Sequence, residues 1–168
     1  MNEAAKRIVE RFEMQAHPEG GYFTEVYRSE VELQHPAIPQ NQTTYRSGGT
    51  FIYYLLAGED FSAFHRLRWT DELWHLYAGG PLELHVIDAM DSYSIRLLTT
   101  NLEQGEPTAV VEAGCWQAAR LAAGADWFFG GCTVAPGFEY ADFEIPLAEE
   151  LLENHAAHAE IIAQLTRK

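Results

Sequence analysis

Residues 58–80 read GEDFSAFHRLRWTDELWHLYAGG and decide how the rest of the chain is interpreted. They place His65, Glu72 and His75 close together in sequence, on two predicted β-strands joined by a short polar turn. Paired strands bring residues several positions apart face to face. We therefore expect an imidazole and a carboxylate to converge on one point of a β-structure.

The alternation of side chains along these strands limits which of the three can meet. His65 shares a predicted strand face with Phe61, Ala63 and Leu67. Strict alternation puts Glu72 on the same face as Trp74 and places His75 on the opposite one. Only a β-bulge or strong twist brings Glu72 and His75 into one pocket. The spacing favours His65 with Glu72 over all three together.

The segments around this stretch predict an all-β architecture. Short strands recur from Thr50 to Phe143, and Gly, Pro and Asp turns separate them, which is typical of a sandwich or barrel. A further strand is predicted over Tyr22–Arg28. Between them, residues 29–49 carry prolines and polar amides and predict a long surface loop, either a functional lid or a poorly ordered segment.

Both ends of the chain predict helices. An apolar stripe of Ala5, Ile8, Val9 and Phe12 predicts a helix over residues 3–15, which His17-Pro18 ends. After Pro146, apolar residues and His155 and His158 form a second stripe. We expect one domain over residues 1–168, with the N-terminal helix in 1–18, the barrel in 19–145 and the C-terminal helix in 146–168.

Composition narrows the classes of partner. The net charge of −14 repels polyanions, so we expect no nucleic-acid partner. No apolar run is long enough for a membrane span, and the charged N-terminal segment does not resemble a signal peptide, so we expect a cytoplasmic protein without a membrane partner. Cys115 and Cys132 lie in predicted strands and are expected to be buried free thiols.

Two motifs carry a resemblance to a known family. Gly58, His65, Glu72 and Gly79 resemble the first motif of the cupins, which are double-stranded β-helix (jelly-roll) barrels. The segment GGCTVAPGFEY (130–140) resembles the second cupin motif. Together with HPEGGYFTEVYRS (17–29), TDELWHLYAGGPLELHVI (70–87) and GCWQA (114–118), the pattern is similar to the Cupin_5 subfamily, a domain of unknown function. The resemblance implies a jelly-roll barrel with a helix at each end.

The sequence departs from the metal-binding pattern of that family. Leu67 stands where the second motif histidine is expected, Tyr140 stands near the place of the third, and the second motif is one residue short between Pro136 and Gly137. A divalent metal usually needs three or more imidazole or carboxylate ligands. His65, Glu72 and His75 would be the ligands of a divalent metal, and we expect no cofactor as the first alternative.

The sugar-nucleotide epimerases of the superfamily, which the chain resembles in outline, work without a metal. That resemblance implies His65 as a base, Glu72 as the group that orients it and Tyr140 as an acid. The alternative for Tyr140, which we favour slightly, is an aromatic residue of the barrel rim. We expect further contacts to a small polar ligand from five residues: Glu19, Arg28, His75, Gln117 and Glu139.

Three functions remain open on the sequence. The first is a metal-independent isomerase or epimerase of a carbohydrate-like small molecule. The second is a metal-dependent oxygenase or lyase, and the third is a module that binds a metabolite without turning it over. Because cupins commonly dimerise through edge strands, we also expect a homodimer.

Overall fold

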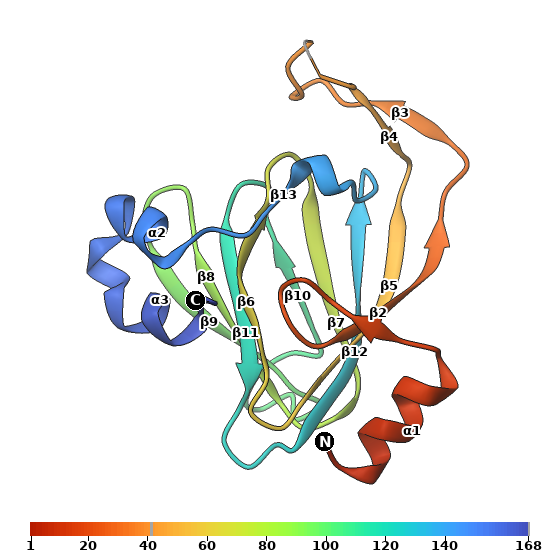
Figure 1. Cartoon of the computed structure of the whole chain (residues 1–168), viewed down its shortest axis with the longest axis vertical. Helices are drawn as coiled ribbons and strands as arrows, with labels where there is room; N and C mark the ends of the chain where they lie inside the picture. Colours follow the sequence, from red (N-terminus) through yellow and green to blue (C-terminus); the bar gives the residue numbers. More distant parts are fainter. Residues whose placement is uncertain (41, 168) are drawn as a thin grey trace.

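Two antiparallel sheets face each other and enclose the core (Figure 1). The computed structural model describes residues 1–40 and 42–167. The six-stranded sheet has the order β1-β2-β5-β12-β7-β10 and the five-stranded sheet has the order β13-β6-β11-β8-β9. The strands of the first are β1 Gln15–Ala16, β2 Tyr22–Arg28, β5 Thr50–Ala57, β12 Trp127–Ala135, β7 Asp71–Gly79 and β10 Thr108–Val111. Those of the second are β13 Phe143–Glu144, β6 Phe61–Leu67, β11 Trp116–Leu121, β8 Leu82–Ile87 and β9 Tyr93–Leu98. The predicted jelly-roll barrel is confirmed.

The space between the sheets holds the main apolar core. Inward-facing residues of both sheets, among them Tyr54, Trp74, Leu84 and Phe128, are fully buried there. The alternation that the strands show in sequence explains this, because every second residue of a strand faces the same side. Cys115 and Cys132 are free and buried, as predicted.

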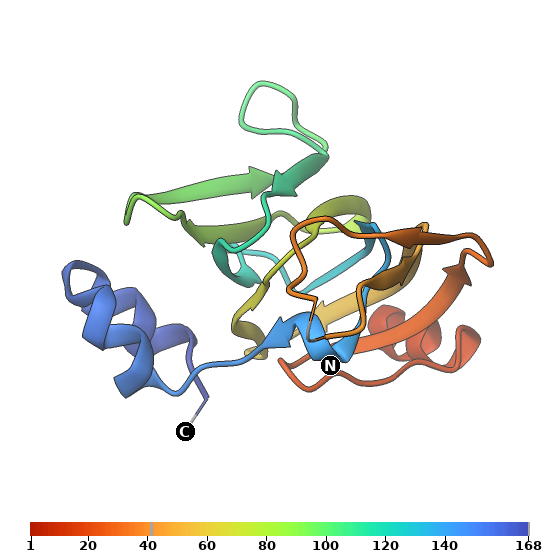
Figure 2. The same cartoon turned by 90° about the horizontal axis from the view of Figure 1, so that it is seen from above.

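The helices cover the outer faces of the sheets on opposite sides of the barrel (Figure 2). Helix α1 spans Glu3–Arg11 and packs Ala5 against Leu55 on the outside of the six-stranded sheet. It is shorter than the predicted 3–15, because Glu13 has a left-handed backbone with φ of 49°. Within the described part of the chain, no helix is long and apolar enough to span a membrane.

The C-terminal segment folds into more than the one helix expected over 146–168. It forms α2 Ala148–Asn154, the short 3₁₀ turn η2 Ala156–His158 and α3 Ala159–Leu165. Leu151, Ile162 and Leu165 pack on the outer face of the five-stranded sheet. His155 and His158 lie at the bend and contact Asp91 in the β8–β9 turn, at 2.7 and 3.1 Å between imidazole nitrogens and Oδ1.

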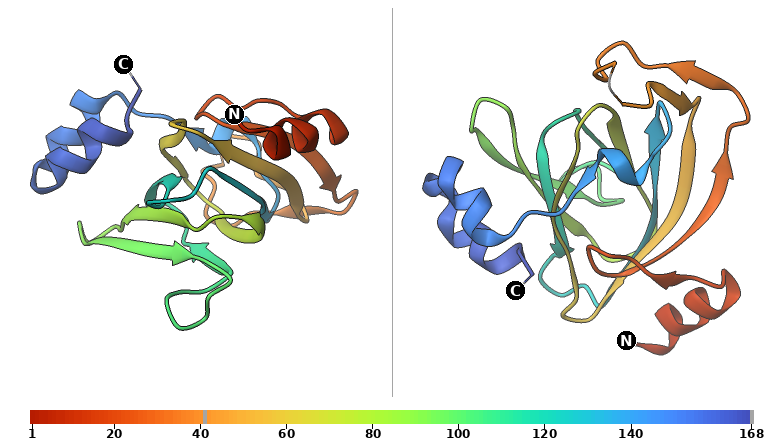
Figure 3. Two further views of the ribbon diagram at one scale, coloured as in Figure 1. Left: turned by 90° about the horizontal axis from the view of Figure 1, so that it is seen from below. Right: turned by 45° about the horizontal axis from the view of Figure 1, so that its top comes forward.

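Two other segments differ from the sequence prediction. Residues 29–49 contain a short hairpin, β3 Glu32–Gln34 with β4 Tyr45–Ser47, which projects from the barrel (Figures 1 and 3). The end of the region predicted as recurring strands is the 3₁₀ turn η1 Tyr140–Asp142 followed by β13. Buried Asp142 links these two segments. Its two carboxylate oxygens accept hydrogen bonds from Nε and Nη2 of buried Arg46, at 2.6 and 2.7 Å.

Candidate functional site

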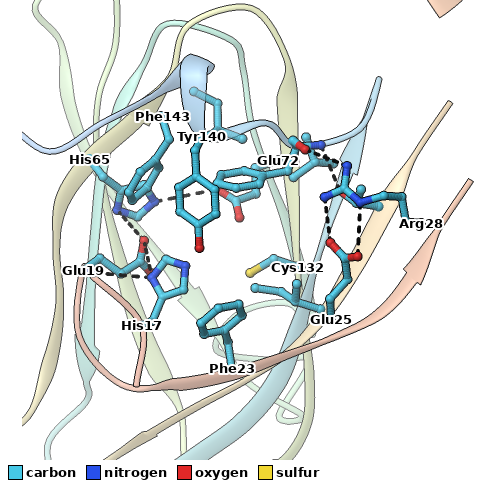
Figure 4. A pocket seen from close by; sticks show the side chains of 15 residues that line it. His17, Glu19, Phe23, Glu25, Arg28, His65, Glu72, Cys132, Tyr140 and Phe143 are labelled. Atoms are coloured by element: carbon cyan, nitrogen blue, oxygen red, sulfur yellow. Dashed lines mark hydrogen bonds and ion pairs between the residues drawn. The ribbon is translucent and has the colours of Figure 1, made fainter. Parts of the chain in front are cut away.

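One pocket opens between the two sheets beside η1 and reaches into the barrel (Figure 4). Its volume is about 80 Å³ for water-sized groups, and about 630 Å³ when the open space at its mouth is counted. Like other small-molecule sites, it is concave and mostly apolar with a few polar groups. The lining residues are His17, Glu19, Phe23, Glu25, Arg28, Thr50, Ile52, His65, Leu67, Glu72, Cys132, Val134, Phe138, Tyr140 and Phe143.

A bulge in β6 turns His65 into this pocket. Opposite β11, the register shifts between Gln117, which pairs with His65, and Ala119, which pairs with Ser62. The extra residue breaks strict alternation, so Phe61 packs with Phe64 on the outer face while His65 faces inward. The predicted shared face of Phe61 and His65 is therefore wrong, but the inward orientation of His65 is right.

Glu72 reaches His65 from the opposite sheet. The two were expected on paired neighbouring strands, but β6 and β7 belong to different sheets and their side chains meet across the barrel interior. His65 Nε2 lies 3.8 Å from Glu72 Oε2, and both side chains are buried. At this distance the two groups form an ion pair but not a hydrogen bond. The Nε2 proton of His65 is therefore available to a ligand.

Gln117 holds Glu72 from behind. Its Nε2 donates to Glu72 Oε2 at 2.6 Å, and its Oε1 accepts the indole N–H of Trp74 at 2.8 Å. All three side chains are buried. Gln117 was expected to contact a ligand, but it does not line the pocket. Its side chain binds Glu72 instead.

Glu19 binds the other side of the His65 ring. Its Oε2 is 3.2 Å from His65 Nδ1, and its Oε1 accepts the Ser62 hydroxyl at 2.9 Å. His65 Nδ1 also donates to the Ala63 carbonyl at 2.8 Å. The turn that delivers Glu19 requires glycine at Gly20, since its φ is 119° and a Cβ there would lie 2.1 Å from the Phe61 carbonyl oxygen.

The two carboxylates decide the charge of His65. Burial by itself lowers the pKa of an imidazole, but Glu19 and Glu72 outweigh it and raise the pKa of His65 to about 9. His17 differs, because burial lowers its pKa despite the opposing effect of Glu19, and its Nδ1 accepts the Glu19 backbone N–H at 3.4 Å. At neutral pH the pocket therefore holds a charged His65 and a neutral His17.

The mouth carries the remaining predicted residues. Tyr140 lines it with a 60% exposed side chain and a ring perpendicular to that of Phe138. Arg28 donates through Nε and Nη2 to Glu25, at 3.1 and 2.7 Å, and through Nη1 to Glu139 at 3.0 Å. Glu139 does not line the pocket itself, but it binds Arg28, which does.

His75 lies outside the pocket. It is on the outer face of β7, where its Nε2 is 3.0 Å from the Thr133 hydroxyl and its ring stacks on Tyr77. The expected contact of His75 to a ligand is wrong for this reason. The residues His65, Glu72 and His75 cannot hold one metal ion together, because strict alternation in β7 separates the latter two. Within the described part of the chain, no group of three or more His, Cys, Asp or Glu side chains has the geometry for a metal.

Sequence reasoning missed His17 and Cys132 as pocket residues. Cys132 was read only as a buried thiol, and burial together with Glu72 and Glu19 raises its pKa well above the usual value. His17 was expected only to end the first helix. The signal that could have found it is its place two residues before Glu19, in the Gly-rich turn that enters the barrel.

Comparison with known proteins agrees with this architecture. A hypothetical protein from Leishmania major has 32% identity, covers 98% of this chain and 99% of its own, and superposes with a TM-score of 0.87. A protein from Shewanella oneidensis has 31% identity, 99% coverage of both chains and a TM-score of 0.84. A cupin 2 domain-containing protein from Halorhodospira halophila shares 13% identity, covers 92% of this chain and 88% of its own, and has a TM-score of 0.56, so it supports the fold alone.

No curated protein matches the sequence. The profile of Cupin_5, described as cupin superfamily (DUF985), matches residues 6–146. This range includes both strands that carry His65 and Glu72 and the turn that carries Glu19. The chain therefore belongs to the Cupin_5 family of the cupin superfamily.

Proposed function

We propose that the chain binds a small carbohydrate-like hydroxycarbonyl compound in this pocket and isomerises or epimerises it by proton transfer without a metal. The observation that carries the proposal is the pair of His65 and Glu72, which face each other at 3.8 Å. Each is fixed by its own buried partner, Glu19 for His65 and Gln117 for Glu72. Groups held this way keep their geometry as a reaction proceeds.

The raised pKa of His65 changes the role expected for it. An imidazole with a pKa of about 9 carries its proton at neutral pH and is an acid rather than a base. Glu72 then takes the proton from the substrate carbon next to the carbonyl. The C–H electron pair forms the C=C bond of an enediol, and the carbonyl oxygen receives the Nε2 proton of His65. Glu72 then delivers its proton to the former carbonyl carbon. The hydroxyl on the deprotonated carbon returns a proton to His65 and becomes the new carbonyl, which completes an isomerisation.

Tyr140 is a second proton donor, and it would allow epimerisation. Its hydroxyl points into the pocket from the mouth, across from the His65 ring (Figure 4). Protonation of the enediol carbon by Tyr140 on the face opposite Glu72 inverts that centre, while the enol hydroxyl returns its proton to His65 and re-forms the carbonyl. Glu72 then gives its proton to solvent, and the Tyr140 phenolate takes one from solvent. The outline resemblance to sugar-nucleotide epimerases supports this assignment, with the base moved from His65 to Glu72.

Solvent exchange tests the proposal. The purified protein is incubated in D₂O with a panel of aldoses and ketoses, and deuterium at the carbon next to the carbonyl is followed by NMR. We expect exchange with at least one sugar, a loss of at least about 100-fold in Glu72→Gln, and a similar loss in His65→Gln.

The matched control is His75→Gln, on the same strand as Glu72 but facing outward, which should exchange at the wild-type rate. Saturable binding without exchange would replace the enzyme with a metabolite-binding module. Exchange that survives in Glu72→Gln would contradict the assigned base.

We also propose that the protein is a cytoplasmic homodimer. The outer edge of β2 supports this, because β1 pairs only with Tyr22 and Phe23 and leaves residues 24–28 without an outer neighbour among the described residues. Val26 and Tyr27 on this edge are 48% and 57% exposed. Pairing with a second copy would close the edge. Sedimentation analysis should give a dimer that Val26→Lys converts to a monomer, and a monomeric wild type would contradict the proposal.

A further inference from the structure

The charged groups of the pocket are unbalanced toward negative charge. Glu19, Glu25 and Glu72 line it, and the charged cations among the described lining residues are Arg28 and His65. His17 adds no charge, because burial lowers its pKa. An anionic ligand would therefore have to find a cation that is not already engaged.

Four of the five N–H groups of Arg28 already donate within the protein. Its Nε and Nη2 donate to the two carboxylate oxygens of Glu25, and its Nη1 donates to Glu139 Oε1 and to the Phe138 carbonyl, at 3.0 and 3.1 Å. Two carboxylates thus neutralise one guanidinium. The bidentate recognition of phosphate that a free arginine offers is already used within the protein.

Deeper in the pocket, His65 is likewise one cation paired with two carboxylates. One imidazolium faces two buried carboxylates, Glu19 at 3.2 Å and Glu72 at 3.8 Å, so one negative charge is left over. The amide of Gln117 donates to Glu72 Oε2, but it is neutral and does not balance this charge. A buried carboxylate without a full counter-charge is costly, and a positively charged ligand would relieve that cost.

Aromatic rings complete the environment that an organic cation prefers. The ring of Phe138 is at 81° to that of Tyr140, and the ring of Tyr140 is at 85° to that of Phe143. His17 is perpendicular to Phe23 on the other wall, at 86° (Figure 4). When neighbouring rings are perpendicular, some of them present their faces to a ligand and others their edges. Ammonium groups are attracted to aromatic faces.

We propose that this pocket selects a small organic cation, so that the substrate of the proposed isomerase is an amine-bearing sugar rather than a phosphorylated or nucleotide-linked one. The inference rests on the proposed function for the reaction, but it concerns charge alone. It also argues against a sugar nucleotide as the substrate. The pyrophosphate of a sugar nucleotide needs a cation, and the described lining residues offer none that is not already paired.

Cys132 reports the charge of the pocket without any knowledge of the substrate. In a Cys115→Ala variant it is the remaining thiol of the chain, and it lines the pocket next to Glu72. We would measure its modification by two methanethiosulfonate reagents, one with a trimethylammonium group and one with a sulfonate, each normalised to its rate with 2-mercaptoethanol. We expect the cationic reagent to react at least tenfold faster.

The matched variants locate the source of the preference. Glu25→Gln should reduce the ratio severalfold, whereas Glu112→Gln, a surface change outside the pocket lining, should leave it unchanged. A ratio of one or less would overturn the inference.

A binding series tests the choice on three related hexoses. Calorimetry with glucosamine, glucose and glucose 6-phosphate should give the tightest binding for glucosamine and no saturable binding for the phosphate. Binding of the phosphate as tight as that of glucosamine would overturn the inference. Because neither measurement requires turnover, a negative deuterium-exchange experiment would reject the isomerase and leave the charge preference standing, and the reverse outcome is equally distinguishable.

Discussion

His65 and His85 lie on the two strands that flank β11, and both are buried, yet their surroundings set opposite charges. His65 faces the barrel interior between Glu19 and Glu72, and its pKa is raised to about 9. His85 faces the outer side, where burial and then Arg120 lower its pKa to about 4 against the opposing Glu83. The comparison teaches that burial does not decide the state of an imidazole here. The number of carboxylates facing it does.

Removing the His65 ring should have the largest effect on stability. In His65→Leu, Glu19 and Glu72 stay buried without their shared cation, and loss of a buried partner of this kind costs about 3–5 kcal/mol. Urea unfolding at pH 7 measures it. His85→Leu is the matched variant, and since His85 is neutral at that pH it should cost clearly less. Equal losses would break the comparison.

The two histidines should also give stability opposite dependences on pH. The pKa of His65 is raised from 6.5 in the unfolded chain to about 9, so its contribution is complete below pH 6.5 and is lost as the pH rises toward 9. The pKa of His85 is lowered to about 4, so its contribution is complete above pH 6.5 and is lost as the pH falls toward 4. Each change is on the order of 3 kcal/mol.

The check is the difference in unfolding free energy between wild type and each leucine variant, measured across pH 4 to 9. For His65→Leu the difference should shrink above pH 6.5, and for His85→Leu it should shrink below pH 6.5. Parallel profiles for the two variants would show that the carboxylates do not act on His65 as described.

Much of this arrangement could be predicted from the sequence, because it depends on local patterns. The alternation in residues 61–79, with glycines at both ends, indicated the strands and the separation of Glu72 from His75. The strand bounds Tyr22–Arg28 were predicted as the structure has them.

The partners of His65 could not be predicted in the same way, because they depend on how distant segments close the barrel. Glu19 comes from a turn before the first long strand, and Gln117 acts from a strand far along the chain. The bulge at residues 62–65 shows only in the register against β11. Tyr140 lies in a 3₁₀ turn that the pattern predicted as strand, since Arg46, from the projecting hairpin, holds Asp142 at that position.

Gln117 offers a smaller test of how Glu72 is held. Gln117→Leu removes the donor to Glu72 and leaves the indole N–H of Trp74 without an acceptor, in a fully buried location. Loss of such partners costs about 1–3 kcal/mol. Thermal unfolding measures it, and Gln117→Glu, which places a third carboxylate beside Glu72, should be worse than Gln117→Leu. The opposite order would contradict the assigned hydrogen bonds.

The smallest effect is expected on the outer face of β7. His75→Ala removes one hydrogen bond to Thr133 at a partly exposed site, so it should change stability by less than about 1 kcal/mol. Chemical unfolding beside His65→Leu gives the contrast between the two sides of the barrel. A loss of the same size as that of His65→Leu would mean that His75 has a buried partner.

The most direct test of the account is an NMR titration of the histidine rings in the native protein, with His65 and His85 assigned through the leucine variants. We expect His65 to titrate near pH 9 and His85 near pH 4, and we expect Glu19→Gln combined with Glu72→Gln to bring the pKa of His65 below 6.5. A wild-type His65 that titrates at or below 6.5 would contradict the claim that two carboxylates share its charge.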